Sequence, residues 1–181
     1  MSSKKVAVLV AGELASGTTE VGQALGSLTG ITVLNSESFF REIAAGFQES
    51  FQYLEKISKS GEVDLEKVLE GMAKDRLAEG SVIIEGRSAL LAMDGGASLS
   101  VFLHKDMVDR KKFLASRRDI DEEEAAKELL ASDQERSEIM RVRFNADWKD
   151  ALLYDLTINT SKLTHQQAAH LIKAAMDATH A

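Results

Sequence analysis

A glycine-containing stretch near the N-terminus, GELASGTTEVG (residues 12–22), has the spacing of a phosphate-binding loop. In the motif G-x-x-x-x-G-K-[ST], backbone N–H groups cradle the phosphates of a nucleotide. The lysine neutralises their charge, and the hydroxyl binds Mg²⁺. Gly12 and Gly17 have the required spacing and Thr19 holds the hydroxyl position, but Thr18 replaces the lysine. The stretch predicts a loop shaped for nucleotide phosphates that lacks its usual cation.

The missing lysine limits the chemistry that this loop can perform. Glu13 adds a negative charge inside the loop, and Glu20 adds another one turn into the segment that follows. A well-placed cation on a transferring phosphoryl group contributes roughly 10³–10⁵-fold in rate. Backbone N–H groups and Mg²⁺ can still bind nucleotide weakly, whereas fast transfer requires a cation from elsewhere. The competing interpretation is a tight strand-to-helix turn without a ligand, since glycines are common in such turns.

Two arginine-rich segments could supply that cation. The stretch HKDMVDRKKFLASRR (residues 104–118) carries six lysines and arginines against two aspartates, a net +4 in a chain of net charge −7. Within it, Arg110 and Arg117 are seven residues apart and share a helical face, and Arg136 and Arg143 repeat this spacing further along. Such pairs would suit a lid that closes over an anionic substrate, and a solvated helix face is the alternative.

Apolar runs alternate with amphipathic segments along the chain, which predicts an α/β fold. Strands are expected at residues 6–12, 31–35, 81–86, 99–104 and 153–159. Helices are expected at residues 18–28, 36–47, 49–60, 64–80, 106–117 and 121–148, and from 164 onward with Leu171, Ile172 and Ala175 facing inward. Strands this apolar form a parallel sheet covered on both faces, and ligands bind such sheets beyond the carboxyl ends of the strands.

Composition excludes several functional classes. The 181 residues include no cysteine, so disulfides, thiol nucleophiles and zinc–thiolate sites are excluded. The 29 acidic residues against 22 basic ones create a negative field that argues against nucleic acid and anionic membranes as partners. The apolar run near the N-terminus is too short for a signal sequence or a membrane span, so a cytoplasmic location is expected.

The chain resembles the cytidylate kinase-like branch of the nucleoside monophosphate kinases over nearly its whole length. The strongest stretch is DQERSEIMRVRFNADWKDALLYDLTINTSKL (residues 133–163), which is similar to that branch's acidic-arginine helix, aspartate–tryptophan turn and closing YDLxINT strand. The resemblance implies one P-loop NTPase domain over residues 1–181. It also implies a five-stranded parallel sheet in the order 2-3-1-4-5 and a helical lid at about residues 110–145.

Shorter stretches carry the rest of the resemblance. IIEGRSAL (residues 83–90) resembles the family's EGR segment, and SESFFREIA (residues 36–44) resembles the segment after its second strand. DRKKFLASRRDIDEEEA (residues 109–125) is similar to the lid, and INTSKL (residues 158–163) to the loop that packs against the donor adenine. Some members read GSGGREIG in the phosphate-binding loop; here Thr19 replaces that arginine, so neither family cation is present.

The resemblance implies a role for each matched residue. Arg41 and Arg87 would bind the acceptor phosphate, and Thr19 and Glu85 would hold Mg²⁺. Lid arginines would close over the transferring group: Arg110, Arg117 and Arg136. The residues expected to contact ATP are Gly12, Ser16, Gly17, Thr18, Thr19 and Ser161.

The implied activity is transfer of the γ-phosphoryl group of ATP to a nucleoside monophosphate, CMP or dCMP. ATP and Mg²⁺ would be the cofactors, and nucleotides the small-molecule partners; no pattern predicts the oligomeric state. Two alternatives remain open. One is a nucleotide-binding module that has lost catalysis and acts as a sensor or partner subunit, and the other is a kinase for a different small phosphate-accepting metabolite.

Overall fold

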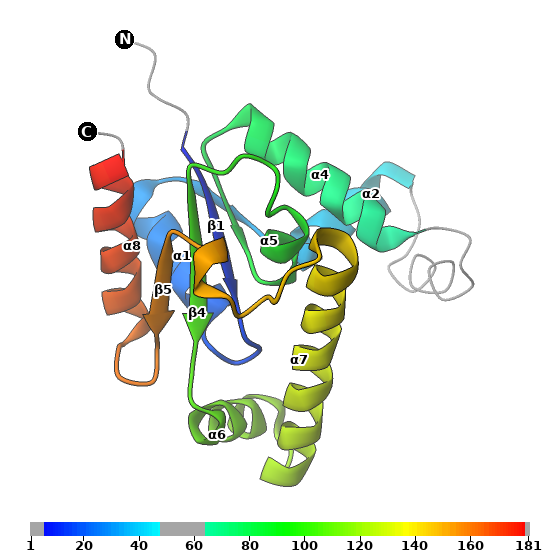
Figure 1. Cartoon of the computed structure of the whole chain (residues 1–181), viewed down its shortest axis with the longest axis vertical. Coiled ribbons are helices and arrows are strands. Elements are labelled where there is room, and N and C mark those ends of the chain that lie inside the picture. Colours follow the sequence, from blue (N-terminus) through cyan, green and yellow to red (C-terminus); the bar gives the residue numbers. More distant parts are fainter. Residues whose placement is uncertain (1–5, 48–63, 180–181) are drawn as a thin grey trace.

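The computed structural model describes residues 6–47 and 64–179, and its centre is a parallel sheet of five strands (Figure 1). The strands are β1 (Ala7–Gly12), β2 (Thr32–Leu34), β3 (Val82–Glu85), β4 (Leu99–His104) and β5 (Leu156–Asn159). They lie in the order β2-β3-β1-β4-β5, and all four pairings are parallel. The predicted fold class, an α/β P-loop NTPase sheet of order 2-3-1-4-5, is therefore confirmed.

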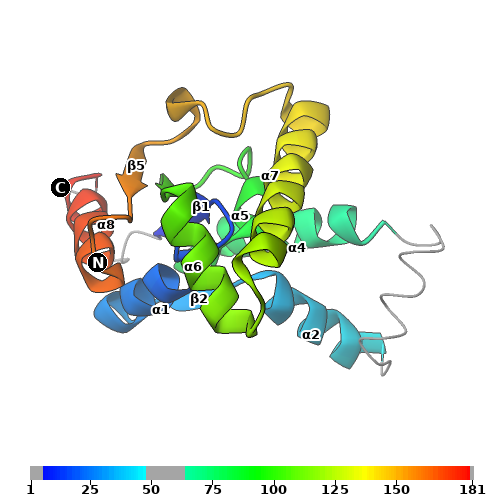
Figure 2. The same ribbon diagram turned by 90° about the horizontal axis from the view of Figure 1, so that it is seen from below.

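Helices cover both faces of this sheet. They are α1 (Thr18–Thr29), α2 (Ser36–Phe47), α4 (Leu65–Glu79), α5 (Arg87–Leu91), α6 (Met107–Arg118), α7 (Glu122–Phe144) and α8 (His165–Thr179), with a 3₁₀ turn η1 (Ala151–Leu153). Helices α1 and α8 pack on one face, where Leu25 and Ile172 are fully buried. Helices α2, α4, α5 and α7 cover the other face, where Phe39 and Leu90 are fully buried (Figures 1 and 2).

Capping side chains set the helix starts that the sequence indicates. Asp64 accepts a hydrogen bond from the Lys67 N–H at 3.0 Å, and Asp121 accepts one from Glu124 at 2.8 Å. These carboxylates satisfy N–H groups that have no partner within the helix. Gly80 ends α4 with a positive φ of 79°. The expected helix at 49–60 lies outside the described residues.

Three expectations about the elements were wrong in detail, and one short helix was not predicted. Helix α7 ends at Phe144 rather than near residue 148, because Asn145 adopts a left-handed conformation with φ 51°. Strand β5 begins at Leu156, since the three residues of η1 precede it. Helix α5 was not predicted, because five residues are too few to show a helical period. Leu171 is 48% exposed, although its neighbour Ile172 is buried.

Helices α6 and α7 pack against each other beyond the carboxyl ends of the strands. Figure 1 has the strand arrows pointing down toward α6, and Figure 2 shows α6 crossing in front of that edge. Leu114, Ala125 and Leu129 form a small buried cluster between the two helices, and Leu14 and Ala15 pack against it. The base of the expected lid is therefore in contact with the glycine loop. None of the helices in the described ranges is long and apolar enough to cross a bilayer.

We expect Leu129→Ala to lower the free energy of unfolding by about 2–4 kcal/mol, because it removes fully buried methyl groups and leaves a cavity between α6 and α7. Leu152→Ala is the matched control, since Leu152 is 92% exposed and should change stability by less than about 0.5 kcal/mol. Urea unfolding of both variants measures the difference. Equal effects of the two substitutions would contradict the described packing of the lid.

Candidate functional site

The loop between β1 and α1 has the backbone form of an anion-binding site. Ala15 and Gly17 have positive φ angles of 66° and 94°, so the chain curls tightly before α1 begins at Thr18. The Thr160 hydroxyl donates to the Ser16 carbonyl at 2.7 Å and holds the loop against the end of β5. The first N–H groups of α1 have no partners within the helix, and such groups bind phosphates and carboxylates.

Two residues expected to bind Mg²⁺ lie together at the end of β3. The Thr19 hydroxyl donates to Glu85 Oε1 at 3.0 Å, and Glu85 is buried. The Asn35 side-chain amide donates to the same oxygen at 2.8 Å and fixes its orientation. Mg²⁺ prefers oxygen ligands, commonly one or two carboxylates completed by water and substrate phosphates. A hydroxyl and an oriented carboxylate beside the loop fit that ion. Asn35 was not predicted as a site residue, although it is the last residue of the expected second strand.

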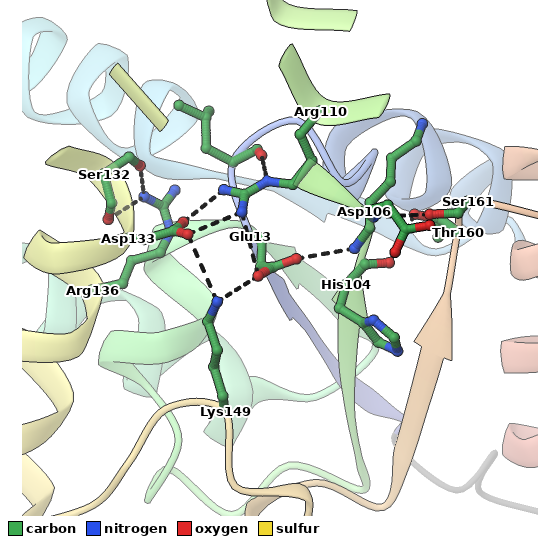
Figure 3. A network of polar contacts seen from close by, with 12 residues as sticks. Glu13, His104, Asp106, Arg110, Ser132, Asp133, Arg136, Lys149, Thr160 and Ser161 are labelled. Carbon is green, nitrogen blue, oxygen red and sulfur yellow. Dashed lines mark hydrogen bonds and ion pairs between the residues drawn. The ribbon is translucent and has the colours of Figure 1, made fainter. Parts of the chain in front are cut away.

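A cluster of four charged residues, of which Glu13 and Arg110 are buried, links the loop to helices α6 and α7, the expected lid (Figure 3). Arg110 of α6 makes a bidentate ion pair with Asp133 of α7, at 2.9 and 2.6 Å. Its Nε donates to the Leu14 carbonyl at 2.8 Å, and its Nη1 lies 3.3 Å from Glu13. Lys149 completes the cluster with a 2.6 Å contact to Glu13. We call these four, Glu13, Arg110, Asp133 and Lys149, the loop–lid ion cluster.

Arg136 lies one turn along α7 from this cluster, and its hydrogen-bonding capacity is only partly satisfied. It contacts the Ser132 hydroxyl and donates to the Ser132 carbonyl at 3.2 Å. Its Nε is buried and has no hydrogen-bond partner among the described residues. Burial is the largest cause that lowers the pKa of Arg136 below its ordinary value. The charges of Glu135 and Asp133 oppose this lowering, and those of Arg87 and Arg110 add to it. Arg87 and Arg110 therefore lie near enough to act on Arg136, whose buried and incompletely paired charge an anion would stabilise.

Arg87 begins α5 and faces two carboxylates. It forms ion pairs with Glu66 of α4 and with Glu135 of α7, the latter at 3.0 Å. Arg143 contacts Glu66 at 3.4 Å and also pairs with Glu70, so α4 and α7 are tied together at this point. A phosphate that reached Arg87 would displace these carboxylates.

Two other arginines predicted for the site, Arg41 and Arg117, do not lie with Arg87, Arg110 and Arg136. Arg41 is exposed on α2, where it pairs with Glu37 on the same helix. Arg117 is exposed on α6 and pairs at 2.7 Å with Glu20 of α1. Each of these two arginines is paired with a glutamate at the surface. Surface ion pairs are weak enough for a phosphate to replace the glutamate.

The side of the loop next to β5 holds Ser161 and a histidine that the sequence did not single out. The Ser161 hydroxyl accepts a hydrogen bond from the Asp106 N–H at 2.8 Å, which connects the end of β5 to the start of α6. The His165 ring lies against Gly17 and meets Phe113 edge-on, with ring centroids 6.3 Å apart. No spacing pattern in the sequence identifies His165, because it packs on a loop far away in the chain.

The fold and this loop define a class of proteins, the P-loop kinases. A solved structure of a protein from Eubacterium ventriosum has a TM-score of 0.73 at 20% identity, covering 96% of this chain and 99% of its own. A shikimate kinase from Acinetobacter baumannii, solved in complex with shikimate, has a TM-score of 0.63 at 15% identity, covering 97% and 94%. At these identities the likeness shows the fold.

Sequence comparison gives the family. The model of the cytidylate kinase-like family matches residues 7–162, and the chain therefore belongs to that family. A cytidylate kinase from Methanopyrus kandleri is 30% identical, with 98% of this chain and 96% of the relative covered. One from Pyrobaculum islandicum is 29% identical over 92% and 90%. These matches confirm the resemblance that the sequence motifs indicated.

We expect Gly17→Ala to destabilise the protein more than Gly30→Ala. Both glycines have a positive φ, which costs a residue with a side chain about 1–2 kcal/mol. A Cβ on Gly17 would also lie 2.7 Å from His165 Nε2, whereas nothing lies within 4 Å of one on Gly30. Thermal unfolding of both variants measures the excess, and a Gly17→Ala variant as stable as Gly30→Ala would refute the His165 contact.

Proposed function

We propose that this protein transfers the γ-phosphoryl group of ATP to a nucleoside monophosphate, with CMP or dCMP as the acceptor. The observation that carries the proposal is the buried, incompletely paired Arg136 close to Arg87 and Arg110, together with the glycine loop before α1 and an oriented Thr19–Glu85 pair. Phosphoryl transfer depends mainly on positioning and charge neutralisation, so it needs these features rather than a general base.

The donor half of the proposal uses the glycine loop. Backbone N–H groups between Gly12 and Thr19 would hold the ATP phosphates, apart from those of Glu13 and Ser16, which donate to the carbonyls of Leu103 and Glu13. Gly12, Ser16, Gly17 and Thr18 would form the loop wall. Thr19 and Glu85 would hold Mg²⁺, which would neutralise phosphate charge. Ser161 would contact the donor from the end of β5.

The acceptor half uses arginines that carboxylates now hold. Arg87 would exchange Glu66 and Glu135 for the acceptor phosphate, and Arg41 would exchange Glu37. Arg110, Arg117 and Arg136 would act on the transferring group from the lid. Arg136 supports this role best, because its buried Nε has no partner among the described residues. Arg110 would have to loosen its pairs with Glu13 and Asp133 to touch phosphate.

Two further points bear on the proposal. The curated relatives named above are cytidylate kinases, which supports CMP as the acceptor. The alternative is a nucleotide-binding module without catalysis, and Thr18 favours it because it cannot neutralise phosphate charge.

The direct test is an assay of phosphoryl transfer from Mg-ATP to CMP, dCMP, UMP and AMP, run on wild type and Glu85→Gln. We expect transfer to CMP or dCMP, and at least tenfold less in the variant with a higher Mg²⁺ requirement, because the amide lacks the carboxylate charge. Glu138→Gln, which changes an exposed ion pair of α7, is the control. Transfer that is equal in wild type and Glu85→Gln would identify a contaminating kinase and reject the proposal.

A second variant tests the missing cation. We expect Thr18→Lys to raise kcat at least tenfold, since the lysine would add positive charge at the donor phosphates. Thr29→Lys at the other end of α1 is the control, because it adds the same charge away from the loop. A Thr18→Lys variant without any gain would mean that other residues already supply this charge. No transfer by wild type together with strong transfer by Thr18→Lys would favour the inactive module.

A further inference from the structure

The glycine loop carries a buried carboxylate that any phosphate site must neutralise. Glu13 Oε2 accepts a hydrogen bond from the Lys105 N–H at 3.0 Å. Its Oε1 lies 2.6 Å from Lys149 Nζ and 3.3 Å from Arg110 Nη1. A buried ionised carboxylate is tolerated only where charges and hydrogen bonds compensate for lost hydration. The partners of Glu13 therefore decide the charge beneath the loop.

Arg110 cannot neutralise Glu13 alone, because it also neutralises Asp133. The bidentate pair with Asp133, at 2.9 and 2.6 Å, is closer than the contact with Glu13. Two carboxylates and one guanidinium leave a net charge of −1. Lys149, which also lies 3.7 Å from Asp133 Oδ2, brings the loop–lid ion cluster to zero.

Lys149 differs from the other three members in where it comes from and how exposed it is. It lies in the segment between α7 and η1, outside the loop and the lid helices. Its side chain is 45% exposed, against 2% for Arg110 and 8% for Glu13. Its N–H donates to Asp147 at 3.0 Å, and its ammonium lies 5.0 Å from the Trp148 ring centre. The local chain therefore directs this lysine toward the loop.

We propose that Lys149 is a positioning residue that neutralises Glu13 and thereby sets the affinity of the glycine loop for polyphosphate. Without Lys149, a net negative charge would lie under backbone N–H groups that must attract phosphates. The inference rests on the proposed function, since it concerns the same loop and the phosphates of its donor. It adds a residue that neither the motif nor the lid arginines identify.

The test is calorimetric titration of wild type and Lys149→Met with Mg-ATP and with inorganic tripolyphosphate. We expect Kd for both to rise roughly tenfold in the variant, because a charge a few ångströms away at a partly buried site is weakly screened. Lys173→Met is the matched control: it removes an ion pair with Asp177 on α8 and should leave Kd unchanged. An unchanged Kd in Lys149→Met would overturn the inference.

Charge rescue separates neutralisation from direct phosphate contact and from a merely structural role. The double variant Glu13→Gln/Lys149→Met returns the cluster to net zero, and we expect its Kd to recover to within about threefold of wild type. Glu13→Gln alone leaves a net +1 and should bind tripolyphosphate more tightly than wild type. It keeps an acceptor for the Lys105 N–H, so it tests the inference even if Lys149→Met does not fold. No rescue, or no tightening in Glu13→Gln, would overturn the inference.

The two proposals fail in distinguishable ways. If polyphosphate binding depends on Lys149 but no phosphoryl group reaches any acceptor, the proposed function fails and this inference stands. If transfer to CMP occurs and Lys149→Met leaves both the ATP KM and Kd unchanged, this inference fails and the function stands. Where wild type does transfer, Lys149→Met should raise the ATP KM about tenfold and leave kcat within about threefold. If wild type binds neither polyphosphate, both fail.

Discussion

The charge balance around the glycine loop is the constraint on which the rest of this site depends. Phosphates carry several negative charges, and the loop offers them backbone N–H groups but no lysine. It also carries Glu13, which is buried against Arg110 and Lys149. A cationic side chain near the loop can therefore neutralise either a carboxylate of the protein or a bound phosphate. The balance between these two uses determines whether nucleotide binds.

The lid illustrates this competition. Arg110 is almost completely buried and paired, and its hydrogen bond to the Leu14 carbonyl ties α6 to the loop. Arg136 lies close by with a buried Nε that has no hydrogen-bond partner among the described residues. The first arginine gives the lid its position, whereas the second has free hydrogen-bonding capacity. A phosphoryl group would gain most from Arg136, because its desolvated charge has the least compensation from protein.

The sequence was sufficient to predict the sheet and the place of the site. Apolar strands, glycine turns and capping aspartates act locally, so β4 was predicted at its observed residues and the start of α7 to within one residue. The Thr19–Glu85 contact was also predictable, since Thr19 follows β1 and Glu85 ends β3 at the same edge of the sheet. The strand order was predicted from the resemblance to the cytidylate kinase-like family, because local patterns alone do not determine it.

The ion cluster was not predictable in the same way. Lys149 and Glu13 are 136 residues apart, and their contact arises only once α7 ends and the chain returns along the sheet. The early end of α7 depends on the left-handed Asn145, which moves residues 145–148 out of the expected helix. His165 likewise reaches Gly17 only through the packing of α8. Pairings of this kind depend on tertiary packing, which spacing patterns do not encode.

The central claim is that this site binds both substrates of a nucleoside monophosphate kinase although its loop lacks the lysine. Calorimetric titration of the wild-type protein at low salt, with Mg-ATP and separately with CMP, tests it most directly. The account predicts that both bind in the micromolar range and that ATP binding weakens when Mg²⁺ is removed. Failure of both nucleotides to bind would contradict it and would leave the fold without the proposed function.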